Sequence, residues 1–159
     1  MLAPLLLAAA TLGECPAGLA NGDAVAGRFA PGHFLPKLTI HNDKSGHAVV
    51  KLENLATGAE HLYFVERGAT AEIRFVPVGS YRLSYAIDPR LAADCRTLLA
   101  ARIVGQFDEP FVFTVEEREV EENGEMATDV IVMNLWATLF AVAKGDAASS
   151  GITVAQFNR

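Results

Sequence analysis

The chain has 159 residues, of which 51% are hydrophobic and 20% charged, so it is long and apolar enough to bury a core. Its formal net charge of −6 argues against binding to nucleic acid or to an anionic membrane surface, because both require clustered Lys and Arg. We therefore expect one folded domain whose partners include neither.

The first twelve residues form an apolar run, MLAPLLLAAATL, which is too short to span a bilayer. Such a run, ending in small residues, predicts a signal peptide or leader within residues 1–20, cleaved after Ala10 or after Ala20. The usual basic start is missing, since the first Lys or Arg is Arg28. An ordinary N-terminal helix or strand is the alternative. The leader predicts an extracytoplasmic protein, either periplasmic or secreted.

Two cysteines, Cys15 and Cys95, are the only ones in the chain. In an oxidising compartment they favour a disulfide, and closing so long a loop would stabilise the fold by about 4 kcal/mol on the chain-entropy model. The pairing depends on processing, because cleavage after Ala20 removes Cys15. Two unpaired thiols are the alternative, and neither cysteine has the neighbouring ligands of a zinc site.

Glycine and proline are dense over residues 21–36, which predicts a linker, and residues 37–159 are predicted to form the folded domain. In its first half, short segments that alternate apolar and polar residues are separated by turn residues. Strands are therefore predicted at Leu38–His41, Ala48–Glu53, His61–Val65, Ala71–Phe75 and Tyr81–Ile87.

The clearest local pattern is Val76–Ala86, a strand, a turn and a second strand. Pro77 and Gly79 set the turn, and the second strand places four apolar side chains on one face. These four are Tyr81, Leu83, Tyr85 and Ile87.

The segment from Asp88 to Gly105 interrupts the strand pattern. Asp88-Pro89 resembles an N-cap followed by proline at the first helical position, and Leu91, Cys95 and Leu98 follow at helical spacing. We predict a short helical insertion here, lying across an open end of the sheets.

The second half returns to strands. Phe111, Phe113 and Val115 alternate with Val112, Thr114 and Glu116, and a charged run leads to Asn123-Gly124, a strong hairpin signal. Residues 127–142 are apolar on both faces, which predicts a central strand or a bent strand that serves two sheets. The tail is expected to close the core through Ile152, Val154 and Phe157.

Together these elements predict a mainly β protein, an antiparallel β-sandwich of about seven to eight strands with one short helical insertion. Several segments also resemble a group of small bacterial extracytoplasmic β-sandwich domains of unassigned function. They are similar, more distantly, to carboxypeptidase-regulatory-like and transthyretin-like sandwiches, which share the Pro-x-Gly-x-Tyr turn. The segments are Leu38-Thr39-Ile40, Val50–Glu53, Thr57-Gly58, Phe64–Gly68 and Val76–Leu83. The resemblance covers residues 37–157 and implies an exported, non-catalytic module; it carries over no functional residue.

Three groups of side chains could hold a ligand. The histidines could meet at a metal, but their spacing matches no ligand pattern. The carboxylates of the charged run could bind calcium, or form a solvated face that keeps a sheet edge from aggregating. The tyrosines could form an aromatic platform, or pack in the core. The residues concerned are His33, His41, His47 and His61; Glu116, Glu117, Glu119, Glu121, Glu122 and Glu125; and Tyr63, Tyr81 and Tyr85.

No catalytic motif, nucleotide loop or cofactor fingerprint occurs, and neither Ser80 nor Ser84 has a histidine in its sequence context. We therefore expect a non-catalytic binding or accessory module that meets a protein or a glycan and needs no cofactor. Such a module should expose an apolar or aromatic patch. The alternative is a small hydrolase or metal-dependent enzyme, which should gather two of His41, His47 and His61 with carboxylates in one pocket.

Overall fold

The computed structural model describes residue 15, residues 18–139 and residues 149–159. These residues form fourteen strands and one four-residue helix, so the predicted mainly β fold is confirmed. The strands outnumber the seven to eight expected because several are short pieces of two or three residues. Most of the predicted leader (1–14 and 16–17), and residues 140–142 of the predicted 127–142 strand, lie outside the described residues.

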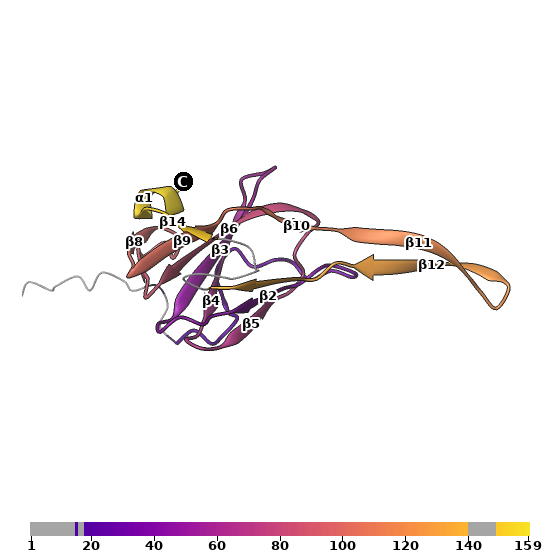
Figure 1. The fold of residues 1–159 in the computed structure, drawn as a ribbon, viewed down its shortest axis with the longest axis horizontal. Helices are drawn as coiled ribbons and strands as arrows, with labels where there is room; N and C mark the ends of the chain where they lie inside the picture. The colour runs from indigo at the N-terminus through magenta and orange to yellow at the C-terminus, as the bar shows by residue number, and fades with distance from the viewer. Residues whose placement is uncertain (1–14, 16–17, 140–148) are drawn as a thin grey trace, which may run out of the picture.

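The larger sheet has seven strands, in the order β1-β4-β3-β6-β9-β14 with β10 also paired to β6 (Figure 1). All of its pairings are antiparallel. Its strands are β1 (Ala24–Ala26), β3 (Ala48–Asn54), β4 (Glu60–Val65), β6 (Gly79–Ile87), β9 (Ile103–Phe107), β10 (Phe111–Phe113) and β14 (Ser149–Gly151).

A smaller sheet packs against it, in the order β13-β2-β5. Its strands are β13 (Leu135–Thr138), β2 (Leu38–His41) and β5 (Thr70–Ile73). β2 and β5 pair antiparallel, whereas β13 and β2 are parallel, an exception to the antiparallel sandwich that we expected. The inner faces of the two sheets share one core, which includes Leu38 and Ile40 from the smaller sheet and Val50 and Leu83 from the larger.

The alternation in the sequence predicted this core well. The five strands expected between residues 38 and 87 are all present, with ends that differ by at most two residues. Along β6, Tyr81, Leu83, Tyr85 and Ile87 are all buried, as their period-two spacing predicts. Removal of this apolar surface from water is the main force that holds the sheets together.

Residues 21–36, which we expected to be a linker, are part of the fold. β1 pairs with β4, and Phe29 is only 4% exposed. The Phe29 ring stacks on His61 at a centroid distance of 3.9 Å, and its backbone N–H donates to the Tyr63 hydroxyl. Glycine and proline correctly predicted irregular backbone here, but one aromatic side chain is enough to fix that backbone on the core.

The segment 88–105 is not helical, so the predicted position of the helical insertion is wrong. Instead β7 (Arg90–Leu91) and β8 (Leu98–Ala100) form a small hairpin. The Asp94 carboxylate accepts hydrogen bonds from the backbone N–H groups of Arg96 and Thr97 and from the Thr97 hydroxyl. A side chain that caps its own turn competes with helix formation, and this capping closes the turn between β7 and β8.

The one short helix of the described residues, α1 (Val154–Phe157), lies near the C-terminus. A capping box between Thr153 and Gln156 begins it. Phe157 is fully buried against Ala86 and Leu98 in a second, small cluster on the outer face of the larger sheet, so it does not close the main core as we expected.

Lys51 holds this helix on the larger sheet. Its side chain is buried on the outer face of β3, where its amine pairs with the Glu60 carboxylate at 2.9 Å and donates to the Phe157 carbonyl. The amine also lies 5.0 Å from the centre of the Phe157 ring. A buried charge requires such partners, so Lys51 acts as a structural clamp.

Candidate functional site

The structure does not bring the four histidines together. His33 is exposed, and the Nδ1 atom of His41 lies 3.0 Å from the Thr70 hydroxyl. His61 bonds to the Gly27 carbonyl, and the Nδ1 atom of His47 accepts the backbone N–H of Arg67 at 3.1 Å. The rings of His41, His47 and His61 thus each have a local structural partner.

Metal binding finds no support in the part of the chain that the structure describes. It holds no group of three or more His, Cys, Asp or Glu side chains arranged to bind an ion. The metal-dependent enzyme that we considered requires two of His41, His47 and His61 in one pocket, and the hollow beside β3 contains His47 alone of these three.

The three tyrosines belong to the core. Tyr63, Tyr81 and Tyr85 are 5%, 1% and 3% exposed, so they offer no platform to a ligand. Burial raises the pKa of Tyr63 although its hydroxyl accepts a hydrogen bond from Phe29. The Tyr81 ring packs edge-on against Phe113, with centroids 5.5 Å apart.

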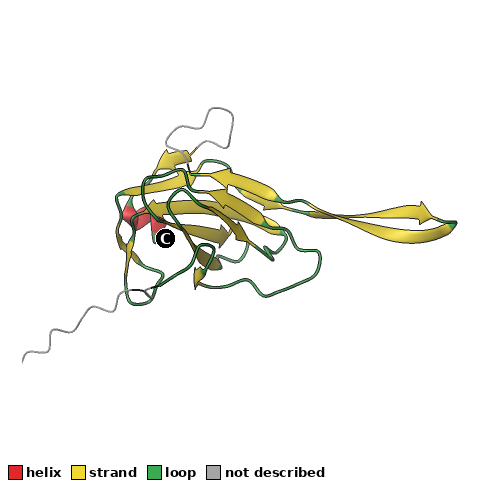
Figure 2. Cartoon of the chain, turned by 90° about the horizontal axis from the view of Figure 1, so that it is seen from below, coloured by secondary structure: helices red, strands yellow, loops and turns green. Residues whose placement is uncertain are grey.

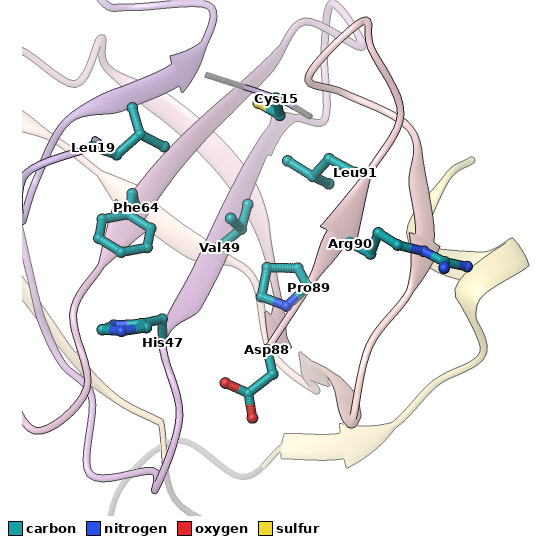
Figure 3. A pocket seen from close by; sticks show the side chains of 9 residues that line it. All are labelled: Cys15, Leu19, His47, Val49, Phe64, Asp88, Pro89, Arg90 and Leu91. Atoms are coloured by element: carbon teal, nitrogen blue, oxygen red, sulfur yellow. The ribbon is translucent and has the colours of Figure 1, made fainter. Parts of the chain in front are cut away.

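A hollow of about 430 Å³ lies beside β3, within the range of small-ligand pockets (Figure 3). Val49, Phe64, Pro89 and Leu91 give it apolar walls. The remaining lining residues are Cys15, Leu19, His47, Asp88 and Arg90.

The carboxylate of the hollow already has a partner, and its arginine points away. The Asp88 carboxylate accepts from the Arg102 Nε at 2.8 Å, and the Arg90 side chain extends away from the hollow in Figure 3. Asp88 adopts a left-handed φ of +50°, and Gly46 leaves the room that its carboxylate occupies: a Cβ atom there would lie 2.2 Å from Asp88 Oδ1. These features fix the chain at the start of β7 and select no ligand.

Cys15 and Cys95 lie at disulfide distance, with Cα atoms 5.0 Å apart. Cys95 occupies the turn of the β7–β8 hairpin, not the apolar face of a helix as we expected. The bridge therefore ties the N-terminal segment to this hairpin at the rim of the hollow.

The most distinctive surface is a hairpin that projects from the rest of the molecule (Figures 1 and 2). We call it the arm: β11 (Val115–Glu122), β12 (Glu125–Val132) and the turn between them. The two strands pair along their whole length, from Val115 opposite Val132 to Glu122 opposite Glu125. Asn123 and Gly124 have φ angles of +55° and +83°, the backbone of the tight hairpin turn that the Asn-Gly pair predicts.

The arm has no other sheet neighbour among the described residues. Within the part of the chain that the structure describes, β11 pairs only with β12, so both outer edges are free. None of its residues is buried, although both strands are eight residues long, or about 26 Å at the usual rise of a strand. The arm therefore lacks the sheet packing that stabilises the two larger sheets. An isolated two-stranded hairpin of this kind is only marginally stable in water.

The arm also carries the net charge of the protein. It has seven acidic residues and one arginine, Arg118, which gives −6, the value for the whole chain. The other residues contain twelve acidic and twelve basic side chains, so they balance. Within the arm, the Arg118 guanidinium lies 3.8 Å from the Asp129 carboxylate, but both side chains are more than half exposed and contribute little stability. The charged run is thus a solvated surface, one of the two alternatives that we considered.

Exposed apolar side chains accompany this charge. Met126, near the tip of the arm, is 68% exposed. At its root Met133 is 44% exposed and Trp136, on β13, is 71% exposed. Exposed apolar side chains thus lie at the tip and at the root of the arm, and the contiguous patch that we expected of an interaction module stays a prediction. Asn123-Gly124 and the charged run predicted a hairpin, but no pattern in the sequence indicated that the hairpin would pair with no other strand.

For residues 127–142 we considered either a central strand or a bent strand that serves two sheets, and the structure shows the bend. β12 belongs to the arm and β13 pairs with β2, so this stretch does serve two sheets. Between them, the Asn134 side-chain oxygen accepts the backbone N–H of Lys37 at 3.0 Å, which fixes the bend on β2.

Comparison with protein-family models, with curated proteins and with solved structures found no match. Among the described residues no helix has both the length and the apolar character needed to cross a membrane. The protein can therefore be classified by its fold alone. It is a mainly β, sandwich-like protein that carries an acidic hairpin.

Proposed function

We propose that this protein is a non-catalytic interaction module that binds a partner protein through the arm. The observation that carries the proposal is the isolation of β11 and β12. Sixteen strand residues stand without a buried side chain, while the rest of the chain is packed around two sheets. A hairpin of this length gains little from its own packing, so a partner that covers it would supply the missing burial.

The exposed residues favour a protein partner over a glycan. Trp and Met are enriched in the centres of protein interfaces, and Met126, Met133 and Trp136 are all exposed here. A glycan platform usually needs several exposed aromatic rings, whereas the three tyrosines are buried.

We also propose that the module acts outside the cytoplasm. The Cys15–Cys95 pair at disulfide distance supports this location, because disulfides persist in oxidising compartments. The apolar start of the chain and its resemblance to exported sandwich domains support the same proposal. An accessory role within a larger envelope assembly fits this location.

Site-specific photo-cross-linking in the cell of origin tests the binding role. A photoreactive residue at Met126, on the arm, should give one adduct of defined mass that an excess of unlabelled protein removes. Val78 is the matched control, since it is 55% exposed but lies outside the arm. Equal labelling from both positions, or no adduct from Met126, would overturn the proposal.

A further inference from the structure

We propose that the partner adds a β-strand to the free edge of β12, and that apolar and basic residues alternate along this strand. The inference rests on the proposed function of the arm and names the chemistry of its partner. Edge addition is a common mode of peptide recognition, in which backbone hydrogen bonds give affinity and alternate side chains give specificity.

The register of the arm identifies the backbone groups that are free. Opposing residues in an antiparallel pair alternate between hydrogen-bonded and non-hydrogen-bonded pairs. At the root, the Thr114 carbonyl accepts the N–H of Met133 at 3.1 Å, so the next pair, Val115 with Val132, is non-hydrogen-bonded. Every second residue of β12 therefore points its N–H and C=O away from β11. These residues are Met126, Thr128, Val130 and Val132.

The side chains of this edge predict the composition of the added strand. The four residues just named share one face of the arm, and none is charged. The other face of β12 carries Glu125, Ala127, Asp129 and Ile131. Neighbouring strands place their side chains beside one another on each face. A complementary strand therefore has apolar residues on the first face and Lys or Arg on the second, beside Glu125 and Asp129.

The β11 edge is less suited to the same role. Its outward backbone groups belong to Val115, Glu117, Glu119 and Glu121, so an added strand would bury almost no apolar surface there. Acidic residues on an edge are also a common protection against unwanted pairing. The two edges of one hairpin thus differ: β11 is protected by charge and β12 is open.

Charge selects a basic partner over a second copy of this chain. Two arms that paired through β12 would each bring a net charge of −6 to the same interface. Like charges opposite each other destabilise a sheet, whereas a basic strand neutralises the arm as it adds.

A synthetic peptide tests this chemistry on the full chain. The probe is a blocked eight-residue peptide that alternates Val and Lys, and the matched control has Glu in place of Lys. Binding of the Lys peptide should slow hydrogen exchange at the free amides of Thr128, Val130 and Val132 about tenfold or more. The amides of Ala127, Asp129 and Ile131 already face β11 and should change little. Equal binding of the Glu peptide would overturn the inference.

Two proline variants test the β12 edge and the β11 edge separately. Thr128 and Glu119 lie directly opposite each other, and the N–H of each faces its own free edge. Proline at either position therefore spares the bonds within the arm. We expect Thr128→Pro to weaken peptide binding about tenfold, and Glu119→Pro to weaken it no more than Glu119→Gln does.

The outcomes distinguish this inference from the proposed function. A larger effect of Glu119→Pro, or peptide binding without amide protection in β12, would overturn edge addition at β12. So would a dimer in sedimentation that Thr128→Pro abolishes, because the occupant would then be a second copy. In each case the cross-link from Met126 would still support binding through the arm. Loss of that cross-link alone would remove the proposed function.

Discussion

The arm and the rest of the molecule, here called the body, differ in the burial of their side chains and in their charge. In the body, side chains such as Leu83 and Ile40 are fully buried between two sheets, and positive and negative charges balance. In the arm, no residue is buried and seven of eight charges are negative. Packing between its own side chains accounts for the structure of the body. The arm makes few such contacts, so packing does not account for its length. This difference is the basis of our proposal that a partner covers the arm.

The largest contrast should appear when one apolar side chain is shortened in each region. Leu83→Ala removes a fully buried side chain and should lower the free energy of unfolding by about 3 kcal/mol. Val130→Ala, in the arm, should change it by less than about 0.5 kcal/mol. Urea denaturation followed by circular dichroism measures both. Equal losses would mean that the arm is part of the cooperative core.

Loss of the cysteine pair should lower the stability of the body and leave the structure of the arm unchanged. Cys95→Ser should lower the free energy of unfolding of the oxidised protein by about 4 kcal/mol, because the bridge no longer restricts the unfolded chain. A reducing agent should destabilise the parent protein equally and leave the variant unchanged. Amide chemical shifts of the arm should stay the same.

Intact-mass analysis of the exported protein, with and without reduction and alkylation, provides the control for this experiment. It reports whether Cys15 survives processing and whether it is bridged. Two free thiols, or a chain that begins after Cys15, would contradict the expected loss of stability.

Two glycines allow the same substitution to be made in both regions. Gly58, in the turn between β3 and β4, and Gly124, in the arm, have φ angles of +71° and +83°, and a Cβ atom at either would meet nothing within 4 Å. Each change to alanine therefore costs about 1 kcal/mol through the backbone alone. Gly58→Ala should lower the melting temperature of the whole protein. Gly124→Ala should instead alter only the amide shifts of the arm, and a matching drop in melting temperature would show that the two regions unfold together.

The smallest effect should follow from pH. Hydrogen bonds from Thr97 and Arg96 lower the pKa of the exposed Asp94 from 3.8 to about 2. Because the folded-state pKa is depressed, this stabilisation is present above pH 3.8 and is lost as the pH falls towards 2. The protection of the Thr97 amide, measured relative to the intrinsic exchange rate at each pH, should fall over this window. Asp94→Asn should remove that pH dependence, and an unchanged profile in the variant would contradict the assignment.

Sequence reasoning succeeded where one physical signal dominated. Period-two alternation from Leu38 to Ile87 located five strands and the buried face of β6. Asn123-Gly124 located the hairpin, since few other dipeptides accept two consecutive positive φ angles.

It failed where a single side chain decided the outcome. Leu91, Cys95 and Leu98 have helical spacing, yet the Asp94 carboxylate closes a turn among them. Phe29 lies among glycines and prolines, yet it packs in the core. The candidate site was hidden for another reason: the charged run identifies a solvated hairpin, but only the tertiary arrangement shows that no other described strand pairs with its edges.

The separation of charge in this molecule has a consequence for how it approaches other surfaces. A neutral body with a charge of −6 at one end is a strong electric dipole. Near a positively charged surface the molecule experiences a torque that turns the arm forward before any atoms touch. Salt shortens the range of this torque to the Debye length, about 8 Å at physiological ionic strength. Adsorption on a cationic support at low salt should therefore align the molecules in one orientation, with their bodies facing the solution.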